Sequence, residues 1–110
     1  MADEIQTQGR REPLPCRRAG ETFETFFEGQ SFRVTYGRFE DGRLAEVFIS
    51  AVKTTTLFDH LARDTGLLLS LALQHGAASA CLASAVSRDG EGRPQGLAGH
   101  VLDAIGGERQ

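Results

Sequence analysis

His60 and Asp64 are the residues of this chain whose types and spacing first suggest catalysis. They stand four residues apart in an apolar stretch with helical spacing, so their side chains would share one helix face. A His–Asp pair supplies a base and its orienting group, but catalysis also needs an activated nucleophile. The candidates, Ser70 and Cys81, are both expected to be buried. We therefore interpret the pair as part of a solvated helix face and expect no catalytic residues.

The histidines and cysteines are spaced too widely for a metal site. His60 and His75 are fifteen residues apart, roughly 22 Å along a straight helix, and His75 suits the negative end of a helix. Cys16 and Cys81 have neither Cys-x-x-Cys spacing nor a histidine within four residues. We expect no metal and no cofactor. Two cysteines are too few for a disulfide framework, so reduced thiols and a cytoplasmic location are expected.

The charged residues restrict the classes of partner. The chain has 110 residues and a formal net charge of −3 at pH 7, which argues against a general nucleic-acid binder. Eleven of the twelve bases are arginine, which suits carboxylate or phosphate recognition, although a GC-rich genome is the simpler explanation. Residues 87–93 lack the acids of a calcium loop and the Gly-Lys-Ser/Thr of a phosphate loop. They are either a connector or a weak phosphate site with two arginines.

Alternating apolar residues predict three strands. Residues 22–28, 31–38 and 44–50 follow a period of two and are rich in Phe, Val and Thr. Short links with turn residues, Gly29-Gln30 and Asp41-Gly42, make neighbouring strands antiparallel. A three-stranded meander with one apolar face needs a cover.

Three helices are predicted after the strands. The first spans residues 57–75 and is apolar on nearly every side toward its end, which is typical of a buried helix. Thr56 and Asp59 resemble a capping box, and Gly76 is the expected stop. A shorter helix over residues 78–87 should bury Cys81, Leu82, Ala85 and Val86, and a last one over residues 97–105 should end at Gly106-Gly107. Strands followed by helices define an α+β domain.

The chain is expected to form one domain. Residues 1–12 are expected to be a flexible N-terminal arm, 13–106 the folded domain and 107–110 a tail. The longest apolar run, residues 66–72, is too short to cross a membrane, and the acidic N-terminus does not resemble a signal peptide. The apolar first helix is covered either by a second copy across a two-fold axis or by Phe26, Phe39 and the last helix.

Several segments resemble the TSCPD domain, an accessory domain on the C-terminal side of many ribonucleotide reductases, including adenosylcobalamin-dependent ones. The matching segments occur in the family's order and cover roughly residues 13–105: they are residues 14–24, 37–49, 63–64, 69–76, 87–90 and 92–94. The Thr-Ser-Cys-Pro-Asp motif that names the family is absent, and no Pro-Asp follows Cys81. A thiol role tied to that motif is therefore not carried over. Cys16 stands beside Arg17 and Arg18, which favours its thiolate without giving it a function.

The resemblance implies an accessory module that has no enzymatic activity by itself. A label taken from its family would nevertheless be ribonucleoside-diphosphate reductase. The first hypothesis is a regulatory module that binds a reductase or another large protein through an arginine-bearing surface. The alternatives are a nucleotide or phosphate binder that uses the same arginines and a mobile-element-encoded inhibitor of a host complex. The residues that would bind the partner or ligand are Arg17, Arg18, Arg38, Arg43, Arg88, Asp89 and Arg93.

Overall fold

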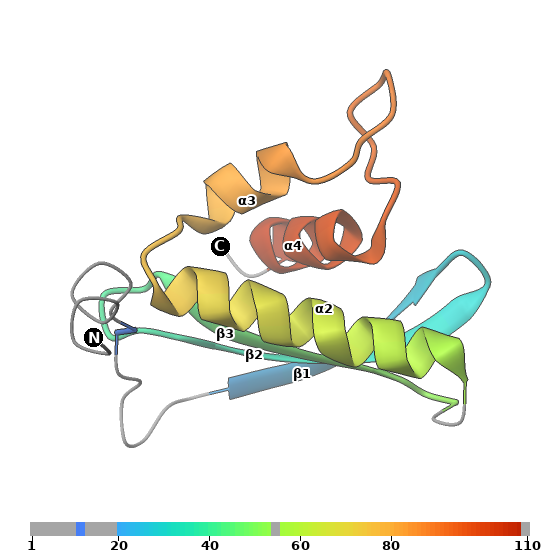
Figure 1. The fold of residues 1–110 in the computed structure, drawn as a ribbon, viewed down its shortest axis with the longest axis horizontal. Coiled ribbons are helices and arrows are strands. Elements are labelled where there is room, and N and C mark those ends of the chain that lie inside the picture. Colours follow the sequence, from blue (N-terminus) through green and yellow to red (C-terminus); the bar gives the residue numbers. More distant parts are fainter. Residues whose placement is uncertain (1–10, 13–19, 54–55, 109–110) are drawn as a thin grey trace, which may run out of the picture.

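The computed structural model describes residues 11–12, 20–53 and 56–108, which form one three-stranded sheet followed by three helices (Figure 1). The predicted α+β class is confirmed. The strands pair in the order β1-β2-β3, each antiparallel to the next. The elements are β1 (Gly20–Phe27), β2 (Gln30–Arg38), β3 (Leu44–Ala51), α2 (Leu57–Gln74), α3 (Ser79–Ala85) and α4 (Leu97–Glu108). Within the described ranges, no helix has both the length and the apolar character needed to span a membrane.

Turn chemistry fixes the register of the sheet. Glu28 and Gly29 connect β1 to β2. Both have positive φ angles, 52° and 79°, as the two central residues of a type I′ hairpin turn require. The turn therefore lies one residue earlier than the expected Gly29-Gln30. The register pairs Val34 with Ile49 and Tyr36 with Val47. These four side chains consequently lie on the same face of the sheet.

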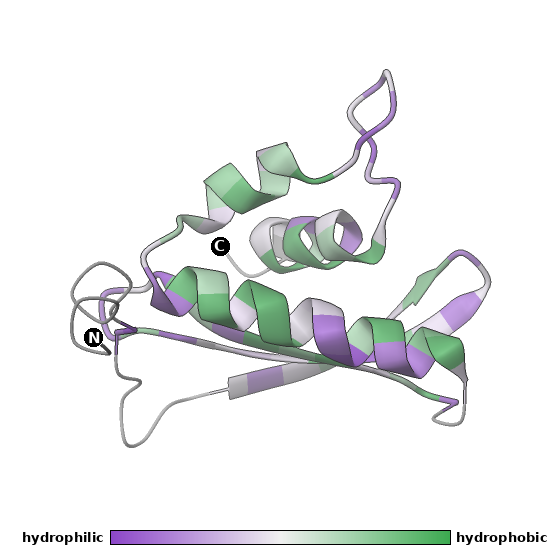
Figure 2. Cartoon of the chain, viewed as in Figure 1, coloured by the Kyte–Doolittle hydropathy of each residue, from purple (hydrophilic) through white to green (hydrophobic). Residues whose placement is uncertain are grey.

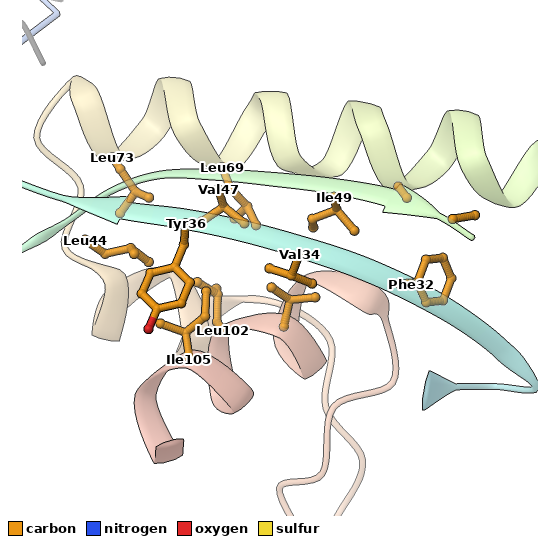
Figure 3. Close-up of a cluster of buried hydrophobic side chains, with 13 residues drawn as sticks. Phe32, Val34, Tyr36, Leu44, Val47, Ile49, Leu69, Leu73, Leu102 and Ile105 are labelled. Carbon is orange, nitrogen blue, oxygen red and sulfur yellow. The ribbon is translucent and has the colours of Figure 1, made fainter. Parts of the chain in front are cut away.

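Helix α4 covers that apolar face. Val101, Leu102 and Ile105 are buried in one cluster with the apolar residues of β2 and β3. Figure 3 shows Leu102 and Ile105 close to Val34 and Tyr36, while Leu69 and Leu73 enter the same core from α2. The spacing of the three α4 residues follows the helical period, so one stripe of the helix is buried. This core holds the domain together.

The opposite face of the sheet is exposed. Phe26 on β1 is 66% exposed and Phe48 on β3 is 54% exposed. Between them, Arg33 pairs with Glu24 across the strands at 3.1 Å. Phe26 lies on this face, away from the helices, and so does not cover α2 as one of the sequence hypotheses supposed.

Helix α2 runs along the free edge of β3 and bonds to its backbone. Ser70 Oγ accepts a hydrogen bond from the Val47 N–H and donates one to the Val47 carbonyl, both at 2.9 Å. Asp59 Oδ1 accepts from the Ala51 N–H at 3.0 Å, and Gln74 Nε2 donates to the Ala45 carbonyl at 3.1 Å. These three polar side chains are buried, because they take the place that a fourth strand would occupy.

Gly66 allows this close approach. A Cβ atom at this position would lie 3.0 Å from Ile49 N and 3.0 Å from the Val47 carbonyl oxygen. Both of these are backbone atoms, so neither can move aside without distorting β3. The helix therefore needs glycine at the point where it passes closest to the strand.

The edge contact also explains why the predicted capping box is wrong. Thr56 is the N-cap residue of α2, but its side chain makes no capping hydrogen bond. The Asp59 carboxylate is directed instead at the Ala51 N–H and at Arg63 Nε, 2.9 Å away. The other end of the helix follows the prediction, since Gly76 has a φ of 106° just after the C-cap.

The predictions for the last two helices need correction. Helix α3 is shorter than expected and contains no buried residue; Cys81 and Ala85 are exposed, while Leu82 and Val86 are half-buried. It packs on α4 at the margin of the core, so its alanine-rich face meets little apolar surface. Helix α4 does not stop at Gly106-Gly107 but runs on to Glu108. Neither glycine has the positive φ angle of a helix-ending residue.

Replacing Gly66 with alanine should destabilise the fold strongly. The added methyl would be forced against the β3 backbone, and overpacking of this kind costs about 1–3 kcal/mol. Urea unfolding monitored by circular dichroism would measure the loss. Gly106→Ala is the matched control, because that helical position has open space around it. Equal stability of Gly66→Ala and the unchanged protein would show that α2 does not depend on close approach to β3.

Candidate functional site

The structure divides the predicted binding residues into two groups. Arg38 and Arg43 lie at the turn between β2 and β3. Arg88, Asp89 and Arg93 lie in the loop between α3 and α4, which projects from the opposite side of the molecule (Figure 1). Arg17 and Arg18 lie outside the described residues. The five described residues therefore lie in two segments of the chain, although Arg88 contacts Asp103, which lines one cavity together with Arg38.

Arg43 is held by acidic and aromatic neighbours. Its Nε lies 2.7 Å from Asp41 Oδ2, its Nη2 lies 3.0 Å from Glu12 Oε2, and its guanidinium lies 4.6 Å from the centre of the Phe39 ring. The backbone N–H and the side chain of Arg43 lower the pKa of Asp41. The Arg43 side chain is 52% exposed, so it keeps access to a partner.

Arg38 lies next to this cluster. It donates to the Gly42 carbonyl at 3.0 Å, and its guanidinium lies 5.6 Å from the centre of the Tyr36 ring. Its side chain thereby joins the end of β2 to the following turn. Arg38 is half-buried, which makes it better placed to line a cavity than to form a flat protein contact.

Arg88 is a structural residue of the α3–α4 connection. Its guanidinium makes a two-pronged contact with the Asp103 carboxylate at 2.8 and 2.9 Å. It also donates to the carbonyls of Ala83 and Gly92, both at 2.8 Å. The hydrogen bonds from Arg88 lower the pKa of Asp103. One side chain thus links α3, the loop and α4.

Asp89 closes the loop on itself. Its Oδ1 accepts hydrogen bonds from the N–H groups of Glu91 and Arg93, both at 2.9 Å. These backbone bonds lower the pKa of Asp89, with Arg93 the larger contributor. A phosphate cradle would need such N–H groups for its ligand, but here the chain's own carboxylate accepts from them. The geometry favours a connector over a phosphate site.

A cavity of about 460 Å³ adjoins Arg38. Its polar lining includes Arg38, Asp103 and Ser79, and its apolar wall includes Leu44, Leu102 and Ile105. The volume falls within the range of small-ligand sites. The sequence analysis missed Ser79 and Asp103, because no local motif marks residues that meet only through the packing of α3 and α4 on the sheet.

The residues first considered for catalysis do not assemble into a site. His60 and Asp64 are exposed on α2, as expected of a solvated helix face. His100 Nε2 lies 2.7 Å from Thr25 Oγ1 and its ring packs on Phe27, with burial lowering its pKa. Within the described ranges there is no group of three His, Cys, Asp or Glu side chains that could hold a metal ion.

These features describe an α+β domain with an arginine-bearing turn, a self-closed loop and a half-polar cavity. Curated proteins similar to this chain include two vitamin B12-dependent ribonucleotide reductases. The protein from Agrobacterium fabrum is 36% identical over 66 residues, which are 60% of this chain and 5% of the reductase. The protein from Bradyrhizobium diazoefficiens is 30% identical over 76 residues, which are 69% of this chain and 6% of the reductase.

The chain spans about a twentieth of the length of these relatives. The similarity is therefore to a small region of the reductases. No family model matches the chain. No solved structure matches it either. The finer assignment to the TSCPD domain stays a prediction.

Acid should unfold the protein as Asp103 and Asp59 become protonated. Arg88 lowers the pKa of Asp103, and Arg63 with the Ala51 N–H lowers that of Asp59, below the ordinary value of 3.8. A lowered pKa in the folded state contributes stability that is complete above the unfolded value and is lost as the pH falls through the folded one. We therefore expect stability to fall below about pH 4.

Asp103→Asn tests this linkage. The variant should be less stable than the unchanged protein at pH 7, and the difference should shrink between about pH 4 and pH 2. Urea unfolding at a series of pH values would measure it. Glu40→Gln, at an exposed turn position, is the control and should follow the unchanged protein. A difference that stays constant down to pH 2 would contradict the assigned role of Asp103.

Proposed function

We propose that this chain is a non-catalytic accessory module of ribonucleotide-reductase-type proteins and that it binds a larger protein. The observation that carries the proposal is the similarity to 5–6% of two vitamin B12-dependent reductases. A region of that size is a minor part of a reductase, so its function is better sought in regulation or assembly than in chemistry.

Arg43 and Arg93 are the described arginines best placed for such a contact. Their side chains are 52% and 71% exposed, whereas that of Arg88 is 21% exposed and holds Asp103. Each of the two has acidic partners in its own turn, Asp41 for Arg43 and Asp89 for Arg93. Those exposed pairs are weak, so a partner carboxylate can compete for either guanidinium. The arginine contact is therefore expected at one of these two positions, which lie on different sides of the molecule, rather than at Arg88.

Affinity capture from the native cell extract tests the proposal. The tagged protein should recover a ribonucleotide reductase, or one large complex, in nearly equal amount. The double variant Arg43→Ala, Arg93→Ala should weaken that interaction a few-fold in a titration with the recovered partner, because it removes the exposed arginine on whichever side the partner binds.

Arg33→Ala is the matched control for the arginine variants. Arg33 is an exposed arginine paired with Glu24, but it lies on the open face of the sheet. Its replacement should leave the affinity unchanged. Recovery of no stoichiometric partner would overturn the accessory function, and an unaffected double variant would overturn the arginine contact alone.

The cavity beside Arg38 favours a second candidate function, the binding of a nucleotide or another phosphate-bearing ligand. Arg38 would contact the phosphate, and the apolar wall with Leu102 would contact the rest of the ligand. A nucleotide at one hundred times its dissociation constant should add about 2.7 kcal/mol to the stability. That corresponds to a rise of roughly 10 °C or more in Tm.

Thermal unfolding with millimolar ATP, dATP and inorganic phosphate would detect such binding. Arg38→Met should abolish the shift, whereas Arg33→Met, a variant of an exposed arginine outside the cavity, should keep it. Unchanged melting with all three compounds would exclude this function.

A further inference from the structure

The two edges of the sheet differ in how their backbone groups are satisfied. At β3, side chains of α2 bond to the outward-pointing N–H and carbonyl groups. At β1, the described part of the chain provides a pairing strand on one side only, which is β2. Figure 1 shows β1 at the margin of the sheet, with β2 and β3 between it and α2.

Every second residue of β1 directs its backbone groups away from β2. Phe27 and Gln30 flank the two-residue turn and therefore form a hydrogen-bonded pair, and such pairs alternate with non-hydrogen-bonded ones along the strands. Among the described residues, no hydrogen bond reaches the groups that point outward. We call this set of residues the outer edge; it consists of Gly20, Thr22, Glu24 and Phe26.

Strand β1 lacks several features that protect an exposed edge from pairing. It is eight residues long, contains no lysine or proline, and pairs with β2 without a bulge. Its Thr and Phe residues favour the extended conformation. Figure 2 shows hydrophilic and near-neutral residues at the start of β1. Backbone hydrogen bonds rather than apolar contact would therefore provide most of the attraction, and the outer edge fits another strand.

A second copy of β1 matches the outer edge when the two strands run antiparallel. Backbone groups pair only where outward-pointing residues face each other. In one register, Glu24 faces the partner's Thr22 and Phe26 faces the partner's Gly20. No like charges are directly opposed, and each aromatic ring lies over a glycine, which is a favourable cross-strand arrangement at a sheet edge.

The chain by itself does not require glycine at position 20. Gly20 has no positive φ angle, and a Cβ atom there would lie 3.4 Å from the Tyr36 carbonyl oxygen, an ordinary contact. The ring of Phe26 is 66% exposed in the single chain. Pairing of two β1 strands would therefore bury an exposed ring on a residue that leaves room for it.

The two neighbouring registers are less favourable. A shift in one direction sets Glu24 against the partner's Glu24, and like charges directly opposite each other destabilise a strand pair. A shift in the other direction sets Thr22 against the partner's Thr22 and moves Phe26 past Gly20, the first residue of β1. The paired stretch would then be shorter.

We propose that two copies of this chain join their β1 strands antiparallel across a two-fold axis at Phe23, which makes one continuous sheet. Both ends of that sheet are β3 edges already bonded by α2, so association stops at two copies. The proposal is independent of the accessory function, because it needs only β1. A contact between two strands is at the low end of interface sizes, below about 1,200 Å² in total. The dimer is therefore expected to be reversible, with dissociation in the micromolar range.

Sedimentation of the purified chain over about 1 to 500 µM tests the association. The average mass should rise from that of one chain toward that of two and no further. Circular dichroism would verify that each variant used below folds. A mass of one chain over the whole range would overturn the proposal.

Glu24→Pro tests the backbone pairing. It removes one outward-pointing N–H from each copy, and an edge strand tolerates proline where the N–H points away from the sheet. The dissociation constant should rise about tenfold or more. Glu24→Ala is the matched control, because it loses the same side chain and its ion pair with Arg33 but keeps the N–H. It should leave the dimer nearly unchanged, and equal effects of the two variants would contradict pairing through the backbone.

Two substitutions of Thr22 test the register. Thr22→Lys sets an ammonium group against the partner's Glu24 and should lower the dissociation constant about fivefold, whereas Thr22→Glu should raise it about fivefold. Both variants lose the same hydrogen bond to Thr35, so the difference between them reports the charge. Equal dissociation constants would show that the register is wrong.

A pair of phenylalanine variants distinguishes the outer edge from the open face of the sheet. Phe26→Ser should weaken the dimer about fivefold, because Phe26 lies on the partner's Gly20. Phe48 is 54% exposed on the same face but belongs to β3, so Phe48→Ser should have no effect. If both variants weakened the dimer equally, the interface would be the open face and the strand pairing would be overturned.

Affinity capture separates self-association from a contact with another protein. A chain that remains single, and whose Glu24→Pro variant no longer recovers the larger partner, would assign the outer edge to a strand of that partner. That result would overturn self-association and leave the accessory function standing. A dimer whose Glu24→Pro variant dissociates but still recovers the partner would support both.

Discussion

The fold depends on the contact between α2 and the edge of β3. A three-stranded sheet has two free edges, and a buried edge with unpaired N–H and carbonyl groups costs a few kcal/mol for each group. Ser70, Asp59 and Gln74 supply these bonds from a helix instead of from a strand. Gly66 lets the helix come close enough for such short side chains to reach. The orientation of α2 about its own axis is thereby fixed, and so is the set of residues that must face outward.

Several arginines of this chain make contacts that stabilise the fold. Arg88 joins two helices through Asp103, and Arg63 supports the Asp59 carboxylate that binds β3. Arg43 and Arg93 form exposed pairs within turns, where the acid is close in sequence and little order is lost in forming the contact. A partner that binds these two has only weak pairs to displace, whereas one that bound Arg88 would have to separate α3 from α4.

The sequence predicts the elements well and their contacts poorly. The alternation of apolar and polar residues predicts the strands, because one face of the sheet is buried by α4. The long apolar run predicts α2. The same run overstates the burial of α2, because the periodicity of apolar residues cannot distinguish a helix that is packed on two sides from a helix that is packed on one. Ser70 has the appearance of a polar interruption, yet it bonds to Val47, which lies 23 residues away. Asp59 has the spacing of a capping residue, and only the position of Ala51 diverts it to β3. The cavity beside Arg38 likewise arises from packing between distant segments.

Two surfaces of the domain expose apolar side chains, and they differ in the residues that surround those side chains. On the open face of the sheet, polar pairs such as Arg33 with Glu24 and Thr22 with Thr35 surround the exposed phenylalanines. Such alternation is typical of an antiparallel sheet with one solvated face. On the side of α2 turned away from β3, Leu57, Leu61 and Leu68 are exposed. Exposure alone does not distinguish the two surfaces, but the neighbouring residues do: polar pairs surround the exposed phenylalanines of the sheet, whereas the exposed leucines of α2 follow one another along one side of the helix.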